Sequence, residues 1–85
     1  MELNQDEFIT AINIGQEIEI CFRGKWYFFR RDRAIKKTEY LFCEMGNSQL
    51  NEIMSFDSIP ELLNMRIQDA LLTTVLCNLD DYTIY

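Results

Sequence analysis

An aromatic-rich β-hairpin predicted in the first third of the chain constrains the fold more than any other stretch of the sequence. In its first half, Ile18, Ile20 and Phe22 alternate with glutamate or cysteine, the period of two expected of a half-buried strand. Turn residues follow at 23–25, and the four consecutive aromatic residues 26–29 return as the second strand. An antiparallel sheet built on this hairpin usually has helices on one face and water on the other.

The register of the hairpin decides which side chains face the core. With a two-residue turn, Phe22 is expected opposite Tyr27, and both side chains face the core. Ile20 and Phe29 form the next such pair. The other face then carries Glu19, Cys21, Arg23, Trp26, Phe28 and Arg30. A three-residue turn reverses this parity. In either register two aromatic side chains of the second strand lie on the second face, which is a binding surface unless the N-terminal helix or the C-terminal tail covers it.

Capping signals and apolar spacing predict one helix before the hairpin and two near the end of the chain. Asn4 is placed as an N-cap, and Glu7 follows it three residues later as in a capping box, so a helix is expected at 5–13. Ser58 caps a short helix in the same way. A broad apolar stripe predicts a further helix at 68–78.

Two more strands are expected between the hairpin and the second helix. A basic connection at 31–37 leads into a strand at 39–45, and a turn at 46–48 leads into a weaker edge strand at 49–56. The tail 80–85 is a candidate for a last extended segment. The predicted fold class is therefore α+β, with an N-terminal helix, a four-stranded antiparallel meander and two C-terminal helices (αββββαα).

The length of 85 residues limits the chain to a single domain, residues 1–85. Its apolar runs are far shorter than the roughly 20 residues that cross a membrane. Its N-terminus is acidic where a secretory signal is basic and then apolar. Three cysteines, an odd number without paired spacing, indicate reduced thiols rather than a disulfide framework. We therefore expect a cytoplasmic protein that has no membrane association.

The chain contains no histidine, which removes the commonest general base at neutral pH and the commonest metal ligand. The absence of histidine also excludes nucleophile activation by Ser-His or Cys-His pairs, and it excludes zinc motifs that use imidazole. Three scattered thiols do not form the paired hooks of a four-cysteine zinc site. We therefore assign no catalytic residue, no metal ligand and no cofactor, and we do not expect an enzyme.

Positive charge is concentrated in one segment. Residues 23–37 hold seven of the eight basic side chains and one acid, a formal charge of +6. The rest of the chain holds one base and thirteen acids, a formal charge of −12, so the net charge is −6. The basic residues of the segment are Arg23, Lys25, Arg30, Arg31, Arg33, Lys36 and Lys37.

This charge layout supports two kinds of partner. Basic side chains interleaved with aromatic rings suit nucleic acid, because the cations neutralise phosphates while the rings stack on bases. The acidic remainder repels a polyanion and favours a basic protein surface instead, including that of a nucleic-acid enzyme. A neutral interpretation is that the cations of the segment pair with neighbouring acids, for example Arg30 with Glu19.

Short motifs along the chain carry a resemblance to a known group of proteins. They are Asp6-Glu7-Phe8, Gly15, Glu17-Ile18-Glu19-Ile20, Gly24-Lys25, Tyr27, Phe56-Asp57-Ser58, Glu61-Leu62-Leu63 and Ile67. In these the chain resembles small uncharacterised proteins of Firmicutes and their phages, over most of its length. It departs from them at Gln68-Asp69, where such proteins often have glycine. The resemblance implies a mobile-element setting and a host cytosol. Small acidic phage proteins include inhibitors of host defence nucleases, such as anti-CRISPR proteins.

The sequence thus predicts a non-enzymatic protein-binding module, of the kind of a phage inhibitor that engages a basic nucleic-acid enzyme through an acidic surface. The second hypothesis is an accessory domain that binds nucleic acid directly through the basic aromatic hairpin at 23–37. Homodimer formation is left open. The candidate binding residues are Arg23, Lys25, Trp26, Phe28, Arg30, Arg31, Arg33, Glu17 and Glu19.

Overall fold

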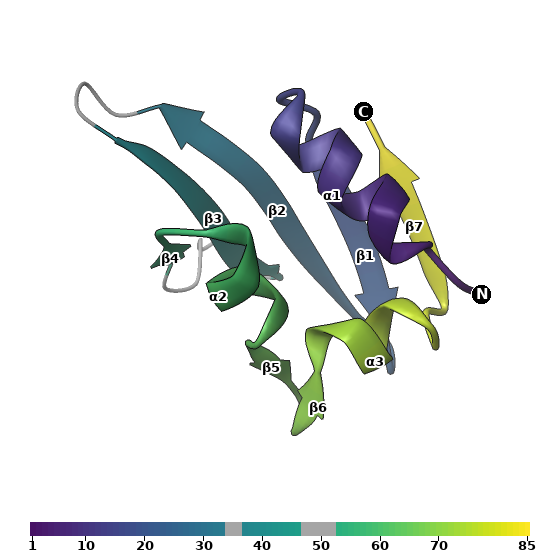
Figure 1. The fold of residues 1–85 in the computed structure, drawn as a ribbon. Coiled ribbons are helices and arrows are strands. Elements are labelled where there is room, and N and C mark those ends of the chain that lie inside the picture. Colours follow the sequence, from purple (N-terminus) through teal and green to yellow (C-terminus); the bar gives the residue numbers. More distant parts are fainter. Residues whose placement is uncertain (34–36, 47–52) are drawn as a thin grey trace.

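The computed structural model describes residues 1–33, 37–46 and 53–85. Within them the chain forms a five-stranded antiparallel sheet of order β4-β3-β2-β1-β7, a separate two-stranded sheet β5-β6 and three short helices (Figure 1). The helices are α1 (Gln5–Asn13), α2 (Ile59–Leu63) and α3 (Leu72–Leu76). The strands are β1 (Ile18–Phe22), β2 (Lys25–Arg33), β3 (Thr38–Met45), β4 (Met54–Phe56), β5 (Arg66–Ile67), β6 (Ala70–Leu71) and β7 (Asp81–Ile84).

The first helix begins and ends where the sequence predicts. The Asn4 side-chain oxygen accepts hydrogen bonds from the backbone N–H groups of Asp6 (2.8 Å) and Glu7 (3.3 Å), so Asn4 is the N-cap. Phe8 is buried on the inner side of the helix. Beyond the helix, Gly15 has a φ of +87°, the left-handed conformation that stops a helix and favours glycine.

The β1–β2 hairpin has the parity expected of a two-residue turn but not the expected residue pairs. Arg23 and Gly24 form the turn with φ angles of +48° and +78°, the left-handed values that a type I′ turn requires. The predicted pair Phe22–Tyr27 is therefore wrong, and Phe22 pairs with Lys25. The next predicted pair is displaced in the same way. Because the displacement is two residues, the side chains within the two strands keep their expected faces. Arg23, which was expected on the second face, lies in the turn instead.

The predicted αββββαα order is wrong, because the last third of the chain contains strands as well as helix. Where one helix was expected at 68–78, the chain forms the end of the β5–β6 hairpin and then the five-residue helix α3. The segment 80–85 contains β7, which pairs with β1 and so adds a strand to the sheet. The fold is α+β, but most of its regular structure in the described residues is antiparallel sheet.

Gln68 explains the break in the predicted helix. Gln68 and Asp69 form the turn of the β5–β6 hairpin with φ angles of +49° and +65°, which no right-handed helix can contain. For residues other than glycine such angles cost on the order of 1–3 kcal/mol each. The Gln68 side-chain amide donates to the Phe22 carbonyl oxygen (3.0 Å) and to the Tyr27 hydroxyl (2.9 Å). These bonds to the β1–β2 hairpin offset the strain. Because they join residues far apart in the chain, the sequence around Gln68 gives no sign of them.

The middle of the chain agrees with the prediction in part. The strand expected at 39–45 is confirmed as β3, whereas the basic connection expected at 31–37 is wrong at its start, because β2 continues to Arg33. Of the edge strand expected at 49–56, the last three residues form β4, which ends the sheet. Residues 34–36 and 47–52, with most of the turn predicted at 46–48, lie outside the described residues.

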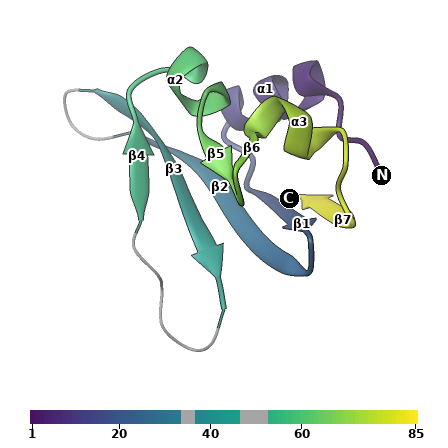
Figure 2. The same ribbon diagram turned by 90° about the horizontal axis from the view of Figure 1, so that it is seen from below.

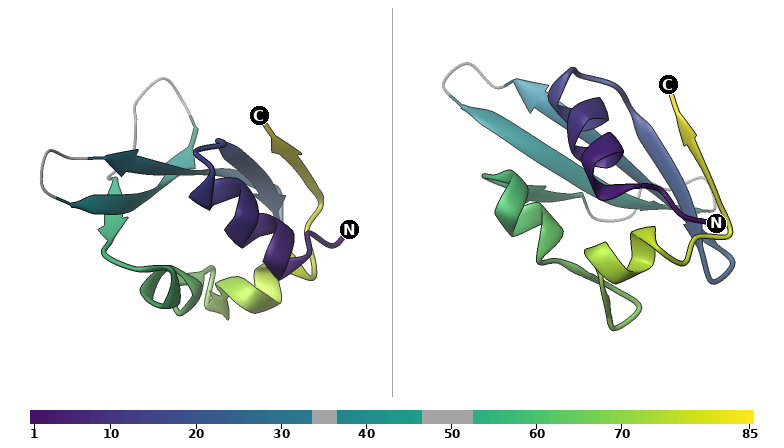
Figure 3. Two further views of the ribbon diagram at one scale, coloured as in Figure 1. Left: turned by 45° about the horizontal axis from the view of Figure 1, so that its top comes forward. Right: turned by 45° about the vertical axis from the view of Figure 1, so that its right-hand side comes forward.

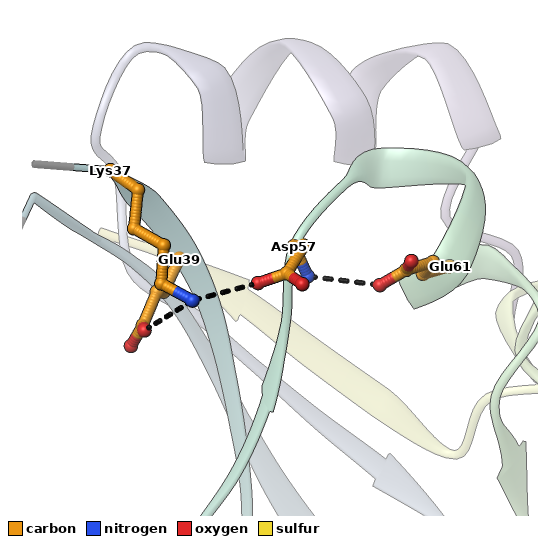
Figure 4. Close-up of polar contacts among 4 residues, drawn as sticks. All are labelled: Lys37, Glu39, Asp57 and Glu61. Carbon is orange, nitrogen blue, oxygen red and sulfur yellow. Dashed lines mark hydrogen bonds and ion pairs between the residues drawn. The ribbon is translucent and has the colours of Figure 1, made fainter.

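The predicted N-cap of α2 is confirmed, but the return hydrogen bond from Glu61 reaches one residue beyond the cap. Ser58 Oγ accepts a hydrogen bond from the Glu61 backbone N–H at 3.3 Å, which makes Ser58 the N-cap. The Glu61 carboxylate in turn accepts from the backbone N–H of Asp57 at 3.0 Å, rather than from that of the cap residue (Figure 4). Two backbone donors at the start of this short helix are thus satisfied.

All three helices lie on the same face of the five-stranded sheet, which we call the helix-covered face (Figures 2 and 3). Phe29 of β2 is at the centre of the core: its ring centroid is 5.1 Å from that of Phe8 in an edge-to-face contact and 5.1 Å from that of Phe42. Tyr27 stacks on Phe42 at 5.6 Å. In the part of the chain that the structure describes, no helix lies on the opposite face, which we call the open face (Figure 3). The sequence alone does not decide whether the N-terminal helix or the C-terminal tail covers this second face. In the structure, α1 lies on the helix-covered face and the C-terminal segment joins the sheet as β7 (Figure 3).

The neighbours Phe28 and Phe29 provide a test of this difference between the two faces. Phe29 is 0% exposed in the core, whereas Phe28 is half-buried on the open face. We expect Phe29→Ala to lower the free energy of unfolding by about 3–5 kcal/mol and Phe28→Ala by about 1 kcal/mol, measured by urea denaturation. Equal losses for the two variants would show that another layer covers the open face.

Candidate interaction surface on the open face

The open face is built by strand alternation. In β1, β2 and β3 the side chains that pack under the helices alternate with those that point away from them. Phe28 of β2 lies between Glu19 of β1 and Cys43 of β3, and Arg30 lies opposite Leu41. The open-face residues of these three strands are Glu19, Cys21, Trp26, Phe28, Arg30, Asp32, Glu39, Leu41, Cys43 and Met45.

A hollow of about 220 Å³ lies on this face, over β2 and β3. Five of the residues around it have apolar side chains or a thiol, and two are charged, Glu17 and Arg30. The five are Phe28, Leu41, Phe42, Cys43 and Ile53. Sites that enclose small molecules usually measure about 300–1,000 Å³. The hollow is therefore suited to one apolar side chain of a partner rather than to an enclosed ligand.

Tyr85, which follows β7, holds one of the acids of this face in place. Its hydroxyl donates a hydrogen bond to the Glu19 carboxylate at 3.0 Å, and its backbone N–H donates to the carbonyl of Glu17 at 2.8 Å. The hydrogen bond to Glu19, partial burial and the charges of Glu19 and Glu17 raise the pKa of the Tyr85 hydroxyl. The phenol is thus held as a neutral donor that orients the Glu19 carboxylate.

Among the residues that the structure describes, acids outnumber cations on the open face. At its far end Lys37 is placed between two carboxylates, with its Nζ 3.2 Å from Asp57 and 3.5 Å from Glu39 (Figure 4). The pKa of this exposed ammonium is raised, first by its hydrogen bond to Asp57 and then by the charge of Asp57 and the contact with Glu39. Lys37 is therefore engaged with acids, and Arg30 is the cation that stands beside the aromatic rings among the described residues.

The other cations predicted for the binding site are directed elsewhere, beginning with those at the hairpin turn. The Arg23 guanidinium lies 4.8 Å from the centroid of the Phe22 ring and donates to the carbonyl of Gln68 at 3.4 Å. Lys25 has the parity of the helix-covered face, and its ammonium lies 3.4 Å from the Glu44 carboxylate. Both cations therefore contact groups away from the open face.

Arg31 and Arg33 share the parity of Phe29 and so point to the helix-covered side of β2. Arg31 donates to the carbonyl of Asn13 at the end of α1, where a cation is favourable because the last carbonyls of a helix carry partial negative charge. Arg33 is exposed at the end of β2. The basic segment of the sequence is consequently not one basic surface, and Lys36 lies outside the described residues.

The structure thus divides the predicted binding residues. Trp26, Phe28, Arg30 and Glu19 share the open face, and Glu17 borders the hollow on it. Four residues of the hollow were missed: Leu41, Cys43, Phe42 and Ile53. Alternation along 39–45 could have identified the first two, because odd-numbered residues of β3 share the open face. No signal in the sequence points to Ile53.

Two of the three free thiols lie on the open face and are unreactive by their surroundings. Cys21 and Cys43 are buried, and burial is the main cause that raises the pKa of each. At Cys21 the Asp80 carboxylate, 3.8 Å from the sulfur, raises the pKa further. A thiol with a raised pKa is a poor nucleophile at neutral pH, because the thiolate is the reactive form. These thiols act as small apolar groups of the surface.

Comparison with known proteins identifies no relative. No protein-family model, no curated protein and no solved structure matches the chain. In residues 1–33, 37–46 and 53–85 there is no cluster of cysteine, aspartate and glutamate that could hold a metal ion. No helix in this part of the chain combines the length and the apolar character needed to cross a membrane.

Thiol labelling tests the burial of the open face. Cys77 is exposed, whereas Cys21 and Cys43 are buried. We expect a thiol reagent to modify Cys77 much faster than the other two under native conditions, followed by mass spectrometry of peptides. Cys77→Ser should remove the fast phase, and unfolding in urea should make all three thiols react alike. Fast labelling of Cys43 in the native protein would contradict the packing described for the hollow.

Proposed function

We propose that this chain is a non-enzymatic protein-binding module that holds a basic partner on the open face of its sheet. The observation that carries the proposal is the apolar hollow on the open face, whose described residues include more acids than cations. In this arrangement an apolar side chain of the partner occupies the hollow, and basic side chains of the partner pair with the surrounding carboxylates.

The apolar part of the face has the composition of an interface centre. Trp26 and Phe28 are half-buried, and Met45 and Ile53 are 40% and 52% exposed. Aromatic residues and methionine are enriched in protein interfaces, and the residues that dominate affinity are usually clustered apolar or aromatic anchors in a well-packed centre. Leu41 at the hollow supplies the wall against which such an anchor packs.

The charged part of the face selects the sign of the partner. Glu17 and Glu19 lie on the β1 side of the hollow, and Asp32 and Glu39 face each other across β2 and β3. With a net charge of −6 the whole chain attracts basic molecules over a longer range. Opposite charge accelerates encounter and discourages wrong partners. A basic protein, such as an enzyme that acts on nucleic acid, has this complementarity.

Direct nucleic-acid binding is the second candidate, and one observation favours it. Arg30 lies on the same strand face as Trp26 and Phe28, the combination of cation and rings that stacks and neutralises a single strand. The acids on both sides of this row oppose it, because they repel phosphates at short range. Among the described cations of the segment, Arg23, Lys25, Arg31 and Arg33 do not add to Arg30 on this face, and Lys37 is paired with Asp57 and Glu39.

Capture by the immobilised chain tests the main proposal. From a nuclease-treated extract of the organism that encodes the chain, we expect the wild type to retain a specific basic protein. Leu41→Lys, which places a charge in the hollow, should reduce retention at least roughly tenfold, as for a dominant interface residue. Ile14→Lys adds the same charge at a residue that is 68% exposed beyond α1 and should retain the partner. Equal retention by both variants would exclude the hollow as the site.

A titration with nucleic acid tests the second candidate. Trp26 is the single tryptophan of the chain and lies on the open face, so its fluorescence reports occupancy there. We expect no saturable change when a single-stranded DNA oligonucleotide is added at physiological salt. Saturable binding that weakens steeply with salt and is abolished by Arg30→Glu would replace the protein-binding proposal with the nucleic-acid one.

A further inference from the structure

A second surface lies at the edge of the sheet formed by β7, apart from the open face. We propose that this edge binds an extended basic peptide as an additional antiparallel strand, with alternate peptide side chains entering the groove between β7 and α1. The inference is independent of the function proposed above, because it uses neither the hollow nor the residues of β2 and β3.

The hydrogen bonds of β7 show which of its backbone groups face outward. In the described sheet β7 is the last strand and has β1 as its neighbour. Tyr85, which continues β7, donates its backbone N–H to the carbonyl of Glu17, the residue directly before β1. In an antiparallel ladder alternate residues bond to the same neighbour, so Asp81 and Thr83 also face β1. Tyr82 and Ile84 therefore direct their backbone N–H and C=O groups to the outer edge, where an added strand would bond.

One of these outward groups is already protected in the free chain. The backbone N–H of Tyr82 donates to the carboxylate of Asp81 at 2.8 Å. This contact is exposed and local, and acids at an edge are a common protection against unwanted strand pairing. A basic side chain on an incoming peptide attracts the Asp81 carboxylate, after which the Tyr82 N–H can pair with a peptide carbonyl. In this proposal the β7 edge therefore pairs poorly with most added strands but pairs with strands that carry basic side chains.

The groove gives the added strand a place for its side chains. Helix α1 packs over β1 and β2 rather than over β7 (Figure 3). Between the flank of α1 and the edge strand there is a depression of about 550 Å³, whose lining includes Thr10 and Ala11 of the helix and Ile84 of β7. Side chains of an added strand alternate, so every second one points into this depression. The space accepts side chains of moderate size.

Charge commits the groove to a basic occupant. Asp6 and Glu7 of α1 line it, and no cation is found among the lining residues that the structure describes. Asp80 and Asp81 add two carboxylates at the start of β7. A second copy of this chain pairing β7 with β7 would bring these acids together, in two molecules that each carry a net charge of −6. A peptide rich in lysine or arginine is complementary, and a second copy is not.

The test uses the intact chain and a synthetic peptide of alternating lysine and valine with blocked ends. In a titration followed by amide NMR, we expect shifts at Tyr82, Ile84 and the α1 flank, and slower hydrogen exchange at the Ile84 amide. An acidic peptide of alternating glutamate and valine should not bind. A peptide with proline in place of valine should bind roughly tenfold more weakly or not at all, because proline lacks the N–H needed for strand pairing.

Matched variants separate the groove from general charge attraction. Thr10→Arg places a cation in the groove and should weaken peptide binding by roughly tenfold, whereas Ile14→Arg adds the same charge outside the lining and should change it less than about twofold. Leu41→Lys on the open face should leave peptide binding unchanged, which keeps this test distinct from that of the proposed function. Equal binding by Thr10→Arg and wild type, equal binding of the proline peptide, or self-association through β7 without peptide would each overturn the proposal.

Discussion

The packing of Phe29 against Phe8 and Phe42 is the contact on which the rest of the structure depends. It joins α1 to two central strands, with both ring centroids 5.1 Å from that of Phe29. Because strand residues alternate between faces, a Phe29 that points under the helices commits Phe28 and Arg30 to the other side. The interaction that closes the core therefore also fixes which side chains of β2 lie on the open face.

The parts of the fold that could be predicted are those set by local chemistry. The cap at Asn4 and the stop at Gly15 define α1 within the chain itself, and alternation along β1 and β2 is enough to assign Phe28 and Phe29 to opposite faces. The last third could not be predicted in this way. Leu71 and the apolar residues after it have helical spacing, but the turn at Gln68 depends on bonds to β1 and β2, more than forty positions away in the sequence.

The candidate site shows the same division between local and distant information. Trp26, Phe28 and Arg30 follow from the parity of one strand. The prediction treats the basic segment as one unit because its residues are adjacent in sequence, although a strand sends neighbours to opposite faces. Arg31 accordingly reaches the end of α1 while Arg30 lies by the rings. The hollow itself needs β3 beside β2, a pairing that the sequence suggests but whose register it does not supply.

Negative charge has a second physical role in a molecule with this much exposed apolar surface. The open face presents Met45 and Ile53, and β7 ends the described sheet; surfaces of both kinds promote self-association when they are uncharged. Carboxylates accompany each of them, Glu17 at the hollow and Asp81 on the edge strand. Two copies of the chain repel each other at these positions, whereas a basic partner is attracted to them. If the two surfaces bind as proposed, the acids keep both of them accessible in the free chain, and the same charges select the sign of the partner.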